Sequence, residues 1–486
     1  MQRLIAVSSE VDRPPQVPAN QRPASNERQD DTYMALLSQH TCLYPAPDVP
    51  KPLQVILSTI SQHYQQNQSH QTSATSTSTN HPIRLRQHGR SRPTHRHSRS
   101  RSRRSPPSPH PNPALHPYTI FERDASPASF SKWGGTLDIH HNTGQVALAE
   151  AGLLDDFKRI ARYDAQVLKI ADRHANIVLD VSGSGDEKRP EIDRRDLRDL
   201  LLKAVPDERI RWGSKVAKVE REEDGTMTLL LAEEGKAVRG FKLVVGADGA
   251  WSKARSLVTA AKPIYAGNTF FTTSVSKSNP YHATMSSLVG PGMYLICDSG
   301  HQIIAQGLAD GSYQINISLP VTEGWATSSA GAALIAEPQA LRKFLLQFYA
   351  DWAPTATDVI RKSDGAFRPW PLYSLLLEAS SWKSVPGLTL VGDAAHLEIP
   401  DGEGVNRALT DGVSLARRIV AHYRVLGDED GKDGDLDAAV REYEAEMLPR
   451  VMQEREENKT KVMLLWAADA PNSFVEAVMG GHVGQE

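Results

Sequence analysis

The stretch Leu388–Leu409 reads L-T-L-V-G-D-A-A-H-L-E-I-P-D-G-E-G-V-N-R-A-L. Its first four residues are mostly apolar, which is typical of a short buried strand. Gly392 and Asp393 follow where that strand would end, and a turn rich in glycine comes next. Apolar residues then recur at helical spacing from Val405 to Ile419. The pattern predicts a site where a carboxylate holds a ligand hydroxyl and a helix N-terminus faces a polar ring edge.

A second stretch repeats the first half of this pattern. Phe241–Leu257 reads F-K-L-V-V-G-A-D-G-A-W-S-K-A-R-S-L. An apolar run again meets a glycine, then Asp248 and Gly249, and a helix is expected to start at Arg255. Two strand–Gly–Asp turns in one chain are hard to explain as surface decoration. We therefore expect both to serve one binding site.

Two upstream motifs fit the same kind of site. Tyr118–Asp124, Y-T-I-F-E-R-D, is a β-rich run in which Glu122 stands at the strand end. In dinucleotide-binding folds, an acid at the end of the second strand binds ribose hydroxyls. Asp193–Arg198, D-R-R-D-L-R, opens a helix with Arg194 in its first turn, where the helix dipole disfavours a cation. A polar or anionic ligand would explain that arginine, and a solvated arginine beside several acids is an equal alternative.

Together these motifs resemble the single-component FAD-dependent monooxygenases related to p-hydroxybenzoate hydroxylase. G-A-D-G-A-W-S-K-A-R matches the Asp-Gly motif of that family, and D-R-R-D-L-R matches its Arg-x-x-Leu helix. L-V-G-D-A-A-H-L, followed by P and G-E-G-V-N, matches its Gly-Asp motif. W-G-G-T-L-D-I-H with T-G-Q is similar to the tetracycline-inactivating monooxygenases and their fungal relatives. The resemblance runs from Tyr118 to Val478.

The resemblance implies an α/β (α+β) fold. A Rossmann-like FAD-binding domain, incomplete at its N-terminus, would be joined to a β-sheet substrate domain and C-terminal helices. The expected divisions are a tail at 1–117, FAD-binding parts at 118–262 and 365–425, a substrate-side sheet at 263–364 and a helical cap at 426–486.

The resemblance also implies cofactor contacts, residue by residue. The adenosine ribose would be bound by Glu122 with Arg123 beside it, and Asp248 would lie at the Asp-Gly turn that the family associates with both FAD and NADPH. Asp138 would lie along the FAD, Arg194 would hold it from its helix, and Asp393 would bind the ribitol hydroxyls. The flavin ring would be lined by Pro400, Gly402, Gly404, Val405 and Asn406. There the helix N-terminus would stabilise the anion that forms when flavin is reduced.

The implied reaction is hydroxylation of a small aromatic or polyketide-like substrate. NADPH (or NADH) would reduce FAD, and molecular oxygen would give a flavin C4a-hydroperoxide that transfers one oxygen atom. No side chain is expected to act as a nucleophile. The two distant cysteines predict no metal site, and the lack of a long apolar run predicts no membrane span. A pI near 6.6 argues against a nucleic-acid partner. We also expect the protein to be a cytoplasmic monomer.

Residues 1–117 depart from the family pattern. They are rich in Pro, Ser, Gln, His and Arg, which predicts a disordered low-complexity tail. A Rossmann glycine turn belongs about 20 residues before the ribose-binding acid. The sequence there reads S-R-S-R-S-R, from Ser98 to Arg103. A mis-assigned exon or reading frame, a cofactor-deficient pseudoenzyme and an RNA-associated protein led by the Arg/Ser tail are the explanations left open. A smaller departure is Lys132, which stands where relatives place an arginine thought to serve NADPH.

The substrate-side region shows β character at Phe270–Val275, Tyr294–Cys297, Gln302–Gln306 and Tyr313–Leu319. Candidate pocket-lining residues, each of which could equally be an ordinary sheet or surface residue, are His282, Met285, Gln306 and Asn316. A charged helix is expected over Asp437–Lys459, with Leu464–Met479 continuing it.

Overall fold

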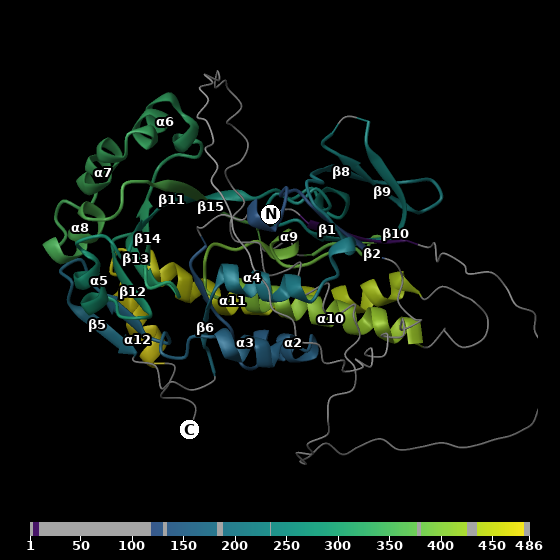
Figure 1. The fold of residues 1–486 in the computed structure, drawn as a ribbon, viewed down its shortest axis with the longest axis horizontal. Helices are drawn as coiled ribbons and strands as arrows, with labels where there is room; N and C mark the ends of the chain where they lie inside the picture. Colours follow the sequence, from purple (N-terminus) through teal and green to yellow (C-terminus); the bar gives the residue numbers. More distant parts are fainter. Residues whose placement is uncertain are drawn as a thin grey trace, which may run out of the picture. The chain divides into compact units, whose positions relative to one another are not determined.

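The structure, a computed structural model, describes residues 3–8, 118–129, 134–181, 188–233, 235–376, 381–424 and 435–480. Within these residues the first sheet has seven strands (Figure 1). In spatial order they are β7 (Ile210–Arg211), β2 (Tyr118–Glu122), β1 (Arg3–Ser8), β10 (Ala237–Ala247), β9 (Met227–Leu231) and β8 (Val216–Arg221), with β16 (Leu388–Leu390) also paired to β10.

Five strands of this sheet point the same way, and β8 is one of them because both β8 and β10 are antiparallel to β9. β7 is parallel to β2, and β16 is parallel to β10. β1 lies between β2 and β10 and is antiparallel to both, so β2 and β10 share a direction. Their carboxyl ends therefore meet at one edge of the sheet, which is where Glu122, Asp248 and Asp393 are found. This is the edge at which open α/β sheets bind ligands.

The strand β1 corrects the prediction that residues 1–117 form a tail throughout. Leu4, Ile5 and Ala6 are almost fully buried in the centre of the sheet, 1–3% exposed. A central strand is covered on both faces, so a short continuous apolar run suffices to place it there. The prediction was wrong for Arg3–Ser8, and the rest of 1–117 lies outside the described residues.

The second sheet also has seven strands in the described residues. In order they are β15 (Arg368–Ser374), β11 (Ile264–Val275), β14 (Tyr313–Leu319), β13 (His301–Gly307), β12 (Met293–Asp298), β4 (Leu168–Ala171) and β5 (Ile177–Val181). The four strands predicted from sequence are confirmed within β11 to β14. β4, β5 and β15 come from outside 263–364, and the domain divisions stay a prediction.

Helices pack against both sheets (Figure 1). One face of the second sheet buries its apolar side chains against α5 (His282–Leu288), α7 (Pro338–Gln347) and α8 (Pro354–Arg361), near α6 (Ser329–Ala336). The first sheet shares its core with α2 (Gly144–Glu150), α3 (Leu154–Ile160), α4 (Arg194–Lys203), α9 (Asp393–His396), α10 (Gly404–Arg424) and α11 (Leu436–Leu465). β3 (Thr136–Asp138) and β6 (Glu191–Asp193) form a small third sheet. The α/β fold class is confirmed.

The C-terminal helices differ from the prediction in one respect. α11 and α10 run side by side (Figure 1), but α11 ends at Leu465 and a separate helix, α12 (Asn472–Gly480), follows a turn. The predicted single continuous element is thus two helices. None of the helices in the described part of the chain combines the length and apolar character needed to cross a bilayer.

Candidate functional site

Asp393 follows the end of β16 through a turn that only glycine adopts easily. Gly392 has φ +58° and ψ −142°, a conformation in which a Cβ atom would be strained. The chain turns sharply there, and Asp393 becomes the first residue of α9. The predicted strand–Gly–Asp turn is therefore present, and the helix predicted near Val405 begins at Gly404 as α10.

Arg255 joins the two strand–Gly–Asp turns. Its Nε donates to the carbonyl of Ala394 at 2.8 Å, and its Nη2 donates to that of Asp393 at 2.7 Å. Its Nη1 donates to the carbonyl of Ala250, beside Asp248, at 2.7 Å. Burial lowers the pKa of Arg255 to about 10, against the opposing effect of the Asp248 and Asp393 charges. The guanidinium fork thus fixes one turn against the other.

The sequence predicted that a helix starts at Arg255. The helix expected from this residue is a single 3₁₀ turn, Arg255–Leu257. Sequence reasoning therefore placed the arginine in the Asp-Gly motif but missed its bonds to the Gly-Asp turn. Its partners are backbone carbonyls 139 and 138 residues away, which a local pattern does not reveal.

Asp411, on α10, holds the other side of the Gly-Asp turn. Its carboxylate is fully buried and accepts hydrogen bonds from Gly392 N at 2.8 Å, His396 Nε2 at 2.6 Å and Arg450 Nη2 at 2.8 Å. Burial alone would raise the pKa of Asp411, but the His396 charge and hydrogen bond, with Arg450 and Gly392, lower it overall. The turn is therefore anchored to both α10 and α11.

The Asp393 carboxylate itself is buried but not hydrogen-bonded. The residue is 8% exposed, and its side chain makes no hydrogen bond within the described part of the chain. Burial raises its pKa to about 6, although the positive charges of His396, Arg194 and others oppose the rise. A buried carboxylate without donors is costly, so its position fits a ligand that brings hydroxyl donors.

Asn406 joins the start of α10 to the segment after β3. Its Nδ2 donates to the carbonyl of Asp138 at 3.0 Å, and its Oδ1 accepts from His140 N at 3.0 Å. The side chain is 1% exposed. The structure thus brings together Asp138 and Asn406, two of the predicted residues, through a backbone clamp that the sequence did not suggest.

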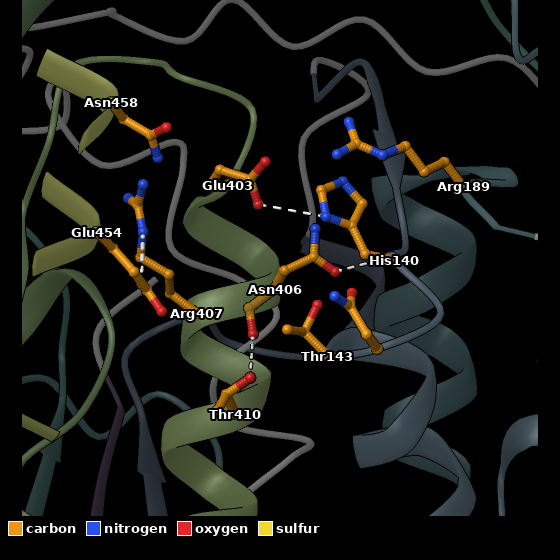
Figure 2. Close-up of a pocket in the computed structure, with 10 residues that line it drawn as sticks. His140, Thr143, Arg189, Glu403, Asn406, Arg407, Thr410, Glu454 and Asn458 are labelled. Carbon is orange, nitrogen blue, oxygen red and sulfur yellow. Dashed lines mark hydrogen bonds and ion pairs between the residues drawn. The ribbon is translucent and has the colours of Figure 1, made fainter. Parts of the chain in front are cut away.

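His140 lies between two carboxylates beside this clamp. Its Nε2 is 2.8 Å from Asp138 Oδ2, and its Nδ1 is 3.3 Å from Glu403 Oε2. Figure 2 shows Glu403 and Asn406 pointing toward His140. All three residues line a cavity of about 240 Å³. The cavity is lined by His140, Asn142, Thr143, Arg189, Glu403, Asn406, Arg407, Thr410, Glu454 and Asn458.

Arg194 contacts the paired glycines that precede β3. It is 6% exposed, and its Nε donates to the carbonyl of Gly134 at 2.9 Å. Gly134 N in turn donates to Gln314 Oε1 of the second sheet at 3.2 Å, and Gly135 has φ +64°. The arginine in the first helical turn therefore supports a glycine segment that lies between the two sheets.

The remaining predicted residues also lie at these turns. Asp248 is 1% exposed and accepts from Ser252 Oγ at 2.5 Å and Lys253 N at 2.6 Å, while burial raises its pKa overall. Gly402, with φ +87°, belongs to the loop before α10, as does Pro400. Gly404 and Val405 form the first turn of α10. The roles of all these residues toward a cofactor stay predictions.

Unlike Asp393, Glu122 accepts hydrogen bonds within the described part of the chain. Its Oε2 accepts from Arg3 Nε at 2.6 Å, and both side chains are fully buried. Its Oε1 accepts from Asp124 N at 2.9 Å. The Nε atom of the neighbouring Arg123 lies 3.9 Å from Asp124 Oδ1. Ribose binding by Glu122 and Arg123 stays a prediction, and the structure shows that the carboxylate already has protein donors.

One face of the second sheet is turned toward this site. The strand register places Gln306 opposite Gln314 and Asn316 opposite Thr272, on the face that reaches Gly134 through Gln314. Of the four candidate lining residues, Gln306 and Asn316 lie on this face. His282 and Met285 lie on α5 instead. Met285 is fully buried in the core, and His282 Nε2 is 2.7 Å from the carbonyl of Gly311. Lys132 lies outside the described residues.

No protein-family model matches the chain. The monooxygenase penA of Penicillium thymicola is 28% identical over 380 residues, which cover 69% of this chain and 86% of that protein. HpxO of Klebsiella pneumoniae, solved with FAD and uric acid, superposes with a TM-score of 0.56 at 19% identity, covering 74% of this chain and 85% of its own. The predicted resemblance to the FAD-dependent monooxygenases is confirmed. The tetracycline destructase Tet(51) shares the fold with a TM-score of 0.52 at 18% identity, over 73% of this chain and 86% of its own.

The residues present fit one end of FAD better than the other. Around Asp393, a buried carboxylate that has no donor among the described residues and the N-terminus of α10 suit the ribitol chain and the flavin ring. Around Glu122, the carboxylate expected to bind the adenosine ribose is held by Arg3. If FAD binds as the resemblance implies, the carboxylate expected at its ribitol chain has no protein donor in the described residues, whereas the one expected at its adenosine ribose already accepts from Arg3.

Proposed function

We propose that this chain is an FAD-dependent monooxygenase that hydroxylates a small aromatic or polyketide-like substrate. Its fold and its sequence resemblance to named monooxygenases support the reaction class. The observation that carries the proposal is the Asp393 carboxylate, which is buried and without a hydrogen-bond donor in the described residues, at the carboxyl edge of β16. The same comparisons favour an enzyme over an RNA-associated protein.

The residues of the site would hold the cofactor in three places. Asp393 would accept hydrogen bonds from the ribitol hydroxyls, held in position by Arg255 and Asp411. The loop through Pro400 and Gly402 would lie along the flavin ring. The N-terminus of α10, a helix of 21 residues, carries about half a positive charge and would stabilise negative charge at the nearby ring edge.

The cofactor would supply the redox chemistry. When bound, FAD reduced by NADPH or NADH would react with molecular oxygen to a C4a-hydroperoxide, passing one oxygen atom to the substrate and leaving the other as water. The chain's own work would be to position the substrate and exclude water. The polar face of the second sheet, with Gln306, Gln314 and Asn316, is the wall we propose for the substrate.

Visible spectroscopy and cofactor consumption test this proposal. The full chain is incubated with FAD, separated from free flavin and scanned, and NADPH oxidation and oxygen uptake are then followed with and without aromatic substrates. We expect a bound-flavin spectrum and slow NADPH oxidation that a good substrate accelerates. A protein that gains no flavin and oxidises no NADPH would refute the proposal. That outcome would favour the cofactor-deficient pseudoenzyme, whereas bound flavin without any NADPH oxidation would refute the monooxygenase reaction and leave the flavin site standing.

A further inference from the structure

We infer that Arg3 serves as an internal counter-ion for Glu122, so that this chain recognises the flavin half of its cofactor and binds flavin mononucleotide about as well as FAD. The inference rests on the proposed flavin site and goes beyond it, because it names which part of the cofactor the protein reads. It is carried by the direction of β1 and by the hydrogen bonds of Glu122.

The direction of β1 decides what the strand presents to the ligand edge. A dinucleotide-binding fold needs the carboxyl end of its first strand at that edge, because the phosphate-binding turn follows it. Here β1 is antiparallel to β2 and β10, and its register pairs Arg3 with both Glu122 and Ala247. The strand therefore brings its amino end, with Arg3, to the ligand edge. Its carboxyl end at Ser8 lies toward the opposite edge.

The Glu122 carboxylate has a protein donor on each oxygen. Arg3 Nε is 2.6 Å from Oε2, and Asp124 N is 2.9 Å from Oε1. The Arg3 guanidinium also lies 5.7 Å from the centre of the Trp212 ring. The side chains of Glu122 and Arg3 are both 0% exposed, so a ribose hydroxyl could reach the carboxylate only if Arg3 moved away.

The exchange is unfavourable to the ribose. The ribose hydroxyl offers a neutral donor, whereas Arg3 offers a charged one, and hydrogen bonds between charged groups are the stronger kind. Moving Arg3 away would also separate two buried opposite charges. The ribose therefore gains little by opening the Arg3–Glu122 pair, and the adenosine half should add little to affinity. Asp393 needs no such exchange, because its carboxylate has no donor to lose in the described residues.

Comparative binding on the full chain tests the inference. Isothermal titration and flavin fluorescence give dissociation constants for FAD and flavin mononucleotide, and ADP is added as a competitor. We expect the two flavins to bind within about threefold of each other, a difference of well under 1.4 kcal/mol. We also expect millimolar ADP to displace neither. FAD binding more than about threefold tighter than the mononucleotide, or displacement of either flavin by millimolar ADP, would overturn the inference.

Three variants locate the effect. Glu122→Gln should leave the ratio of the two affinities unchanged, whereas a drop in FAD affinity alone would contradict the inference. Arg3→Met should free the carboxylate and raise the preference for FAD about tenfold, the value of one hydrogen bond to a charged group. The double variant Arg3→Met/Glu122→Gln should lose that preference again. Circular dichroism checks folding, and Glu122→Gln decides alone if Arg3→Met does not fold.

Failure of the proposed function is distinguishable from failure of this inference. If neither flavin binds to the wild-type chain, the flavin site itself is refuted, and the inference falls with it. If FAD binds and flavin mononucleotide does not, the flavin site stands and only the inference is refuted.

Discussion

Asp393 and Glu122 occupy comparable places in the sheet but differ in whether the protein donates hydrogen bonds to their carboxylates. Each is an acid at or just beyond the carboxyl end of a strand, and the two strands, β16 and β2, point the same way in one sheet. Asp393 is buried without a hydrogen-bond donor in the described residues, whereas both oxygens of Glu122 accept bonds from the protein. The difference comes from the neighbours. Arg3 on β1 donates to Glu122, whereas in the part of the chain that the structure describes no cationic side chain donates a hydrogen bond to Asp393.

The comparison separates what a motif can predict about a carboxylate from what it cannot. A strand followed by an acid predicts where the carboxylate lies, because parallel strands end at a common edge. It does not predict whether the carboxylate is available, because that depends on donors from other segments. Arg3 lies 119 residues before Glu122 in the sequence.

The largest expected effect is on stability, when the hydrogen bonds by which Arg255 joins the two strand–Gly–Asp turns are removed. Arg255→Ala removes a buried guanidinium that bonds to both turns, leaving their carbonyls without donors. We expect the free energy of unfolding to fall by about 4 kcal/mol, measured by chemical denaturation. Arg239→Ala, at an arginine whose side chain is 68% exposed, is the matched control and should leave the midpoint unchanged. Equal midpoints for the two variants would contradict the role of Arg255.

A smaller loss should follow from Asp411→Asn. The change removes the charge that pairs with His396 and Arg450, and we expect a cost of about 3 kcal/mol, measured as a lower thermal midpoint. Flavin affinity should also fall, since the Gly392 turn loses part of its anchor. Asp351→Asn, with a side chain 68% exposed, is the control. An Asp411→Asn variant as stable as this control would show that the Gly-Asp turn does not depend on α10.

The smallest expected effect is a pH dependence of flavin affinity that comes from Asp393 and not from Glu122. The pKa of Asp393 is raised to about 6 by burial, so the free protein holds a proton there below that pH. Ligand hydroxyls that donate to the carboxylate favour its ionised form and lower its pKa. Flavin should therefore bind more tightly as the pH rises from 5 to 7, by about tenfold at most, with proton release. Asp393→Asn should flatten the profile and Glu122→Gln should not, as titration calorimetry would record. A slope retained in Asp393→Asn would assign the proton to another group.

Many of the strands, helices and turns around the candidate site could be predicted from local sequence patterns. The buried strand before Asp393, the helix from about Val405 and four strands of the second sheet follow from apolar runs and glycine turns, and all are present. The residue types of the flavin end also have local signals, since Gly392 and Gly402 adopt conformations that favour glycine.

Long-range partners could not be predicted in the same way. The bonds of Arg255 to the Gly-Asp turn, the clamp of Asn406 on Asp138 and the pair of Arg3 with Glu122 each join segments more than 100 residues apart. The strand β1 was missed because its apolar run is four residues long and stands before a polar, proline-rich stretch. The strand is buried because it pairs with β2 on one side and with β10 on the other, which its own residues do not reveal.

The central claim is that Asp393 is kept for a ligand rather than for the fold, and one pair of measurements on Asp393→Ala tests it most directly. Because the carboxylate has no hydrogen-bond donor to lose in the described residues, the variant should be at least as stable as the wild type by chemical denaturation. Its affinity for FAD, from fluorescence titration, should nevertheless fall at least about tenfold, the value of one hydrogen bond to a charged group. A variant that binds FAD as tightly as the wild type, or that loses stability by about 2 kcal/mol or more, would contradict the account.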